Sequence, residues 1–187
     1  MTQYCNLYRP SSVYPDMKKL REVLTQLSDQ QKLDILQQKY SGKGYPFWRS
    51  ALYCAAVRDD TEIISTLLTS IQSSADRLKL LMVDDKWTPL HEATCWVHTD
   101  SVKMILNCLT ANQQIQIMSV QIDGMTAIQM AERRGQTVSV RVLREYQHKA
   151  YNLMQRRREQ RINEEKTRQR LSGINDSFGC LVKFLYT

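Results

Sequence analysis

The chain contains 187 residues, of which 42% are hydrophobic and 24% charged, and it carries a formal net charge of +7. These proportions are ordinary for a globular protein, and the low numbers of Gly (6) and Pro (4) favour helices. The sequence shows no uncharged apolar run long enough for a membrane span, no apolar signal segment and no cysteine framework typical of disulfides. We therefore expect a protein of a reducing compartment, the cytoplasm or alternatively the nucleus.

The first predicted elements are an extension and a partial repeat. We assign residues 1–15 to an N-terminal extension and residues 16–43 to a capping half repeat. In the half repeat, MKKLREVLTQL at 17–27 supplies a helix and QQKLDILQQ at 30–38 supplies a connector. The stretch SGKG at 41–44 lacks the spacing of a phosphate-binding loop and is interpreted as a link.

An internal repeat with a period of 38 residues follows. Three segments align at this offset: SALYCAAVRDDTEIISTLL at 50–68, TPLHEATCWVHTDSVKMIL at 88–106 and TAIQMAERRGQTVSVRVLR at 126–144. Each begins with a hydroxyl residue that can cap a helix, and Pro89 suits a first helical position. The threonines at 61, 99 and 137 can each begin a second helix with apolar residues at helical spacing. We therefore predict units of two short helices, stabilised mainly by packing on neighbouring units.

These segments resemble the ankyrin repeat, whose pattern begins T-P-L-H-x-A-A. The middle segment matches this pattern through Thr88, Pro89, Leu90, His91 and Ala93. The resemblance covers residues 44–146, divided at about 44–82, 83–120 and 121–146. It implies an all-α, ankyrin-type α-solenoid of helix-turn-helix repeats.

The period of 38 exceeds the period of about 33 that is usual for ankyrin repeats. The extra residues follow the second helix, where short apolar groups at 33–36, 78–81 and 115–118 each precede the next turn. We predict a short additional helical turn in each connector.

The segment WTPLHEATCWVHTD at 87–100 gathers several reactive side chains. His91, Cys95 and His98 have spacings that a zinc site could use, although a structural zinc site needs four ligands. The resemblance implies instead that the His91 ring bonds to backbone and to the threonine hydroxyl, and that His98 lies in the turn between helices. Glu92 has no partner nucleophile that would make it a catalytic base. We expect no catalytic residue, no metal site and no cofactor, and hence a protein that is not an enzyme.

The resemblance also implies a binding surface, because ankyrin stacks bind proteins through their turn tips and the concave face of their first helices. Trp, Met and Arg are enriched at interface centres, so the two tryptophans at 87 and 96 are the leading candidates. An alternative for both tryptophans is packing against the core from the rim. The predicted partner-binding residues are Phe47, Arg49, Arg58, Asp85, Trp87, Trp96, Met125, Arg133 and Arg134.

The C-terminal part carries most of the net charge. Residues 139–171 contain no Gly or Pro, so the last repeat helix is predicted to continue into a long helix. Residues 141–171 hold ten Lys or Arg against four Glu. We assign 147–172 to a basic charged helix, supported slightly by pairs such as Glu164 with Arg168, and 173–187 to an apolar tail.

A basic patch on this helix offers a second type of binding site. An acidic protein face, nucleic acid or a nuclear import receptor would suit it, and a solvated helix without a specific role is the simpler alternative. The helix lacks the aromatic residues typical of single-strand binding. The patch consists of Arg156, Arg157, Arg158 and Arg161.

Two functional hypotheses follow. The first is a non-enzymatic adaptor or scaffold module that binds a partner protein through the concave ankyrin surface. The second is a nucleic-acid-associated or nuclear protein that uses the helix at 156–170. Ankyrin folds serve many unrelated partners, so the sequence leaves the identity of the partner and the oligomeric state open.

Overall fold

The computed structural model describes residues 17–38, 50–83 and 87–185, and it describes side-chain surroundings as far as Leu171. Within these residues the fold is all-α, with one isolated β-bridge between Ile122 and Met125. The helices are α1 (Met17–Gln26), α2 (Asp29–Leu36), α3 (Ala51–Val57), α4 (Thr61–Thr69), α5 (Ser74–Leu81), α6 (Pro89–Cys95), α7 (Thr99–Asn107), α8 (Ala111–Ser119), α9 (Ala127–Arg133) and α10 (Thr137–Leu185).

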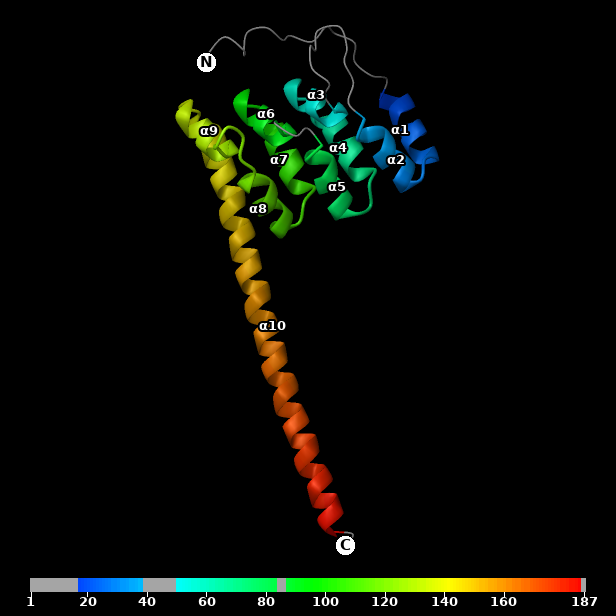
Figure 1. Ribbon diagram of the computed structural model, residues 1–187, viewed down its shortest axis with the longest axis vertical. Helices are drawn as coiled ribbons and strands as arrows, with labels where there is room; N and C mark the ends of the chain where they lie inside the picture. Colours follow the sequence, from blue (N-terminus) through cyan, green and yellow to red (C-terminus); the bar gives the residue numbers. More distant parts are fainter. Residues whose placement is uncertain (1–16, 39–49, 84–86, 186–187) are drawn as a thin grey trace.

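The helices form three rows that run across the repeats (Figure 1). The first helices α3, α6 and α9 pack side by side, and α4, α7 and α10 form the row of second helices. The third row contains α2, α5 and α8, which are the connector segments. These connectors hold helices of eight, eight and nine residues, so the predicted additional turns are present and are longer than a single turn.

The first helices begin as the sequence predicts. The hydroxyls of Ser50, Thr88 and Thr126 accept hydrogen bonds from backbone N–H groups three residues further on, at 3.2, 3.3 and 3.3 Å. Pro89 is at the start of α6. A backbone N–H at this position has no carbonyl partner within the helix, so proline costs no hydrogen bond there. The second helices α4, α7 and α10 begin at the predicted threonines.

The turn between the first and second helix has the same backbone conformation in each repeat. Asp59, Val97 and Gly135 lie 38 residues apart and have φ values of +55°, +61° and +68°. Only the third position is a glycine, the residue that adopts positive φ without strain. A β-branched residue such as Val97 is strained in this conformation, so the stack imposes the turn there.

The apolar contacts between repeats change at the C-terminal end of the stack. Ile64 and Leu68 on α4, and their equivalents Val102 and Leu106 on α7, are completely buried. In the last repeat the residues at the same register are Val140, which is half-buried, and Arg144, which is exposed. The Arg144 guanidinium forms an ion pair of 2.6 Å with Glu132, beside an open hollow of about 680 Å³. A polar outer face of this kind is typical of a terminal repeat.

The α10 helix has 49 residues, which corresponds to a length of about 74 Å. Its first part packs on the repeats: Leu143 and Ala150 are completely buried, and the Tyr146 hydroxyl donates to Asn107 Oδ1 of α7 at 2.8 Å. The remainder projects beyond the repeats (Figure 1), and its backbone continues through the predicted apolar tail to Leu185. No helix in the described part of the chain is both long and apolar enough to cross a membrane.

Candidate protein-interaction surface

Three residues that end the first helices lie at one register. Arg58, Trp96 and Arg134 are the C-terminal caps of α3, α6 and α9, and each has a φ of −92° with a ψ within 2° of zero. The three helices pack side by side (Figure 1), so these cap residues follow one another along the same end of the row. We call this set the cap row.

Trp96 lies at the centre of the cap row and is held by a hydrogen-bond network. Its indole N–H donates to Glu92 Oε1 at 2.6 Å, and the Tyr53 hydroxyl donates to Glu92 Oε2 at 2.9 Å. Glu92 is 9% exposed, whereas Trp96 is half-buried. A carboxylate that accepts two such bonds in a sheltered position fixes the indole ring. The network therefore joins α3 to α6 and presents part of the Trp96 ring to solvent.

The third repeat contributes two exposed arginines. The Arg134 guanidinium donates to the Cys95 carbonyl at 3.4 Å, and Gln136 donates to the same carbonyl at 2.8 Å. The Arg133 guanidinium contacts the Met125 sulfur at 3.7 Å. A guanidinium has five N–H donors, and among the described residues neither arginine forms an ion pair with a carboxylate. Both side chains therefore keep donors for a ligand.

The two tryptophans have different surroundings. Trp87 is half-buried, and its ring centroid lies 6.4 Å from that of His91 at an interplanar angle of 51°. The Trp87 indole N–H is itself buried and makes no hydrogen bond within the described part of the chain. Trp87 therefore packs partly against the interior, whereas the Trp96 indole N–H is bonded to Glu92. The predicted residues Phe47, Arg49 and Asp85 lie outside the described residues.

His91 has a structural role inside the second repeat. The ring is completely buried, and its Nδ1 lies 2.7 Å from the Thr88 hydroxyl. The same hydroxyl accepts the His91 backbone N–H, and it can donate its own proton to Nδ1 in the tautomer that carries the ring proton on Nε2. Nε2 makes no well-formed hydrogen bond within the described residues. Burial lowers the pKa of His91 to about 4, and the nearby Val120 backbone carbonyl opposes only part of this shift.

Two of the three residues considered as zinc ligands, His91 and His98, use a ring nitrogen in other contacts. His98 Nδ1 lies 3.0 Å from the Ala56 carbonyl and so connects α7 to the preceding repeat. The Cys95 carbonyl accepts the two bonds from the third repeat. In the part of the chain that the structure describes, no group of three or more His, Cys, Asp or Glu side chains is arranged to hold a metal. Burial raises the pKa of the half-buried Cys108 thiol, which disfavours its reactive thiolate form.

Sequence reasoning missed the polar contacts that join neighbouring repeats. The pairs Tyr53–Glu92 and His98–Ala56 are separated by 39 and 42 residues. Residues close to one repeat length apart face each other across adjacent units, so a search for complementary side chains at this separation could have found the Tyr53–Glu92 pair. Glu92 was considered only as a catalytic base, and its role here is to position Trp96.

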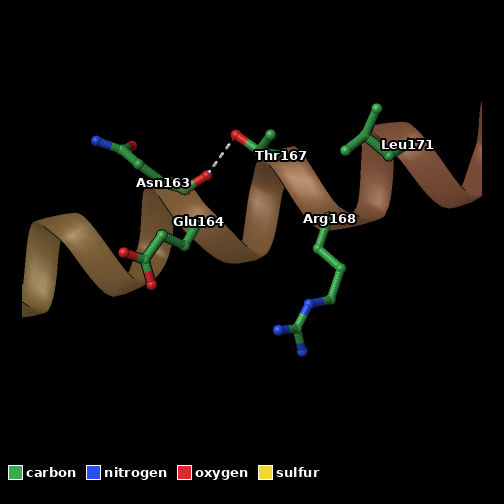
Figure 2. A pocket seen from close by; sticks show the side chains of 5 residues that line it. All are labelled: Asn163, Glu164, Thr167, Arg168 and Leu171. Atoms are coloured by element: carbon green, nitrogen blue, oxygen red, sulfur yellow. Dashed lines mark hydrogen bonds between the residues drawn. The ribbon is translucent and has the colours of Figure 1, made fainter.

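The predicted basic patch lies on the projecting part of α10, where residues 155–171 are all exposed. Successive helical residues turn by about 100°, so Arg156, Arg157 and Arg158 point in three different directions. Figure 2 shows Glu164 and Arg168 extending separately from the helix, and no ion pair joins them; that predicted support is therefore absent. The Thr167 hydroxyl instead donates to the Asn163 carbonyl at 2.9 Å.

The comparison with known proteins identifies the repeat. A family model described as ankyrin repeats, in three copies, matches residues 18–117, which is more than half of the chain. No curated protein and no solved structure matches the chain. The matched residues include α2 and all of α1 except Met17, so the N-terminal unit belongs to the repeat array. The chain is a member of the ankyrin repeat family.

Proposed function

We propose that this chain is a non-enzymatic adaptor module that binds a partner protein through the cap row and the adjacent surface of α3, α6 and α9. Ankyrin repeats are generally protein–protein interaction modules. The observation that carries the proposal is the arrangement of Trp96, a half-buried ring held by Glu92 between two arginine positions. The scattered cysteines are typical of a reducing compartment, and on this ground we place the protein in the cytoplasm as part of the proposal.

The energetic argument concerns preorganisation. Tryptophan and arginine are the residue types most enriched among interface positions with large binding contributions. A ring that is already fixed by a hydrogen bond loses little conformational freedom when a partner covers it. Trp96 has this property because Glu92 and Tyr53 hold it in the unbound protein.

The test is affinity capture from an extract of cells that express the protein. Three baits are compared: the full chain, the full chain with Trp96→Ala, and the full chain with Tyr151→Ala, which removes an exposed aromatic ring from α10. We expect at least one protein that the full chain and the Tyr151→Ala variant retain and the Trp96→Ala variant loses. The same set of proteins on all three baits contradicts the proposal.

Nucleic-acid binding by the projecting part of α10 is a second candidate function. The observation that favours it is the exposure of its arginines, which form no ion pairs within the described residues. Binding of a labelled DNA or RNA duplex should weaken steeply with salt, because each neutralised phosphate releases counterions. The double variant Arg157→Glu/Arg158→Glu should reduce both the affinity and the salt dependence. Binding that this variant leaves unchanged contradicts the candidate.

A further inference from the structure

The carboxylates around the cap row are already engaged by the protein itself. Glu92 accepts from Trp96 and Tyr53, and Glu132 pairs with Arg144 on the end face of the stack. Asp59, in the turn beside Arg58, accepts two hydrogen bonds from Ser101. The acidic groups in this region are therefore directed toward partners within the stack.

The two arginines of the third repeat are not neutralised in this way. Arg133 and Arg134 are exposed, and each uses one terminal N–H group on a neutral acceptor, the Met125 sulfur and the Cys95 carbonyl. Arginine binds carboxylates through two parallel N–H···O bonds, and this geometry needs donors that are still available. Arg58, at the equivalent position two repeats earlier, donates its Nε–H to the Cys54 carbonyl at 3.4 Å.

The spacing of the cap row sets the size of a matching ligand. Packed helices are separated by about 8–10 Å, so the cap residues of three adjacent helices span about 20 Å. An extended chain covers about 3.3 Å per residue, so a segment of about six residues matches this span. In such a segment the central residue lies on Trp96, and the residues at either end lie near Arg58 and Arg134.

We infer that the partner segment is an acidic peptide in extended conformation, with an apolar or aromatic residue on Trp96 and Asp or Glu side chains on Arg133 and Arg134. This inference rests on the proposed function, because it assigns a ligand chemistry to the same surface. Complementary charge selects the partner and accelerates the encounter, and the ring supplies the contact that excludes water.

The test is selection from a phage-displayed library of random twelve-residue peptides on the immobilised full chain. Selected peptides are then measured against four proteins: the full chain, Trp96→Ala, the double variant Arg133→Glu/Arg134→Glu, and the control Arg157→Glu/Arg158→Glu. The control makes the same change in net charge on α10, away from the cap row. The melting temperature of each variant confirms that it is folded before its affinity is compared.

We expect selected peptides to be rich in Asp and Glu around an apolar residue and to depend on Trp96. Charge reversal at Arg133 and Arg134 should weaken their binding at least about tenfold, because like charges then face each other, while the α10 control should change it less than about twofold. Acidic peptides that lose binding in the α10 control and keep it in the Arg133/Arg134 variant overturn the inference.

Two further outcomes separate the inference from the proposed function. Peptides that depend on Trp96 but carry no acidic surplus, or that tolerate charge reversal, overturn the acidic ligand and leave the binding surface standing. A selection in which no peptide depends on Trp96 contradicts the proposed surface, and the inference fails with it.

Discussion

The Asp59 carboxylate caps a helix that belongs to the following repeat. It accepts hydrogen bonds from the Ser101 backbone N–H at 3.3 Å and from the Ser101 hydroxyl at 2.6 Å. Ser101 is the third residue of α7, and His98, which precedes that helix, makes no capping bond because its ring reaches back to the Ala56 carbonyl. The start of α7 is thus stabilised from across the repeat interface, which couples the first repeat to the second.

Removal of this capping carboxylate should destabilise the stack. Asp59→Ala is expected to lower the free energy of unfolding by about 1–2 kcal/mol, because a helix loses its cap and a buried hydroxyl loses its acceptor. Asp59→Asn should have a smaller effect, since asparagine keeps an acceptor and tolerates positive φ. Urea unfolding of Asp59→Ala, Ser101→Ala and the double variant measures the coupling energy between the two residues. Strictly additive effects of the two substitutions would rule out the coupling.

The strained turn at Val97 gives a prediction of opposite sign. Val97→Gly should raise the free energy of unfolding by about 1 kcal/mol, because glycine adopts the observed φ of +61° without steric strain. The matched substitution Gly135→Val should lower it by a similar amount. A Cβ at Gly135 would meet no atom within 4 Å, so backbone strain is the main cost there. Thermal unfolding measures the stability of both variants. A Val97→Gly variant that is less stable than the parent would contradict the prediction.

The buried imidazole of His91 predicts a pH dependence. Its pKa is about 4 in the folded protein and about 6.5 in the unfolded chain, so unfolding takes up a proton between these values. The stabilisation from neutral His91 is complete above about pH 6.5 and is lost as the pH falls toward 4, by about 3 kcal/mol in all. His91→Gln, which copies the residue at this register in the third repeat, should lack this component. Urea unfolding at a series of pH values gives the free energy of unfolding for both proteins. If this free energy changes with pH in the same way in parent and variant, His91 is not the cause of the pH dependence.

The repeat architecture could be predicted from sequence because local signals recur at a fixed offset. Ser50, Thr88 and Thr126 cap helices through their own side chains, so each signal and its effect lie within four residues. The connector helices were predicted too short because at least half of the residues in Asp29–Leu36 and Ser74–Leu81 are polar, and only three or four apolar residues mark each helix. Periodicity cannot define the length of a helix that buries so narrow a stripe.

The candidate site could be predicted only as a set of positions. The register indicated Trp96 and Arg134, but not that Glu92 orients Trp96 or that the Cys95 carbonyl accepts from Arg134. These contacts depend on the side-chain conformations of neighbouring repeats, which a single sequence does not specify. The difference between Trp87 and Trp96 has the same origin, because both are tryptophans near the ends of α6 and only packing distinguishes them.

The packed and projecting parts of α10 should respond differently to truncation. A chain that ends at Gln155 keeps the buried Leu143 and Ala150, so its melting temperature should stay within about 2 °C of the parent value. A chain that ends at Tyr146 loses the Ala150 contact and should melt at a clearly lower temperature. Circular dichroism measures both transitions. Equal destabilisation by the two truncations would mean that the projecting part also stabilises the repeats.

The most direct test of the central claim is a comparison of affinity and stability for Trp96→Ala. The ligand is the strongest peptide selected on the full chain, and fluorescence anisotropy and urea unfolding give the two quantities. The cap-row arrangement predicts an affinity loss of at least about tenfold, with a decrease in the free energy of unfolding of no more than about 2 kcal/mol. An affinity within about twofold of the parent, together with a decrease of more than about 3 kcal/mol, would place Trp96 in the core and contradict the account.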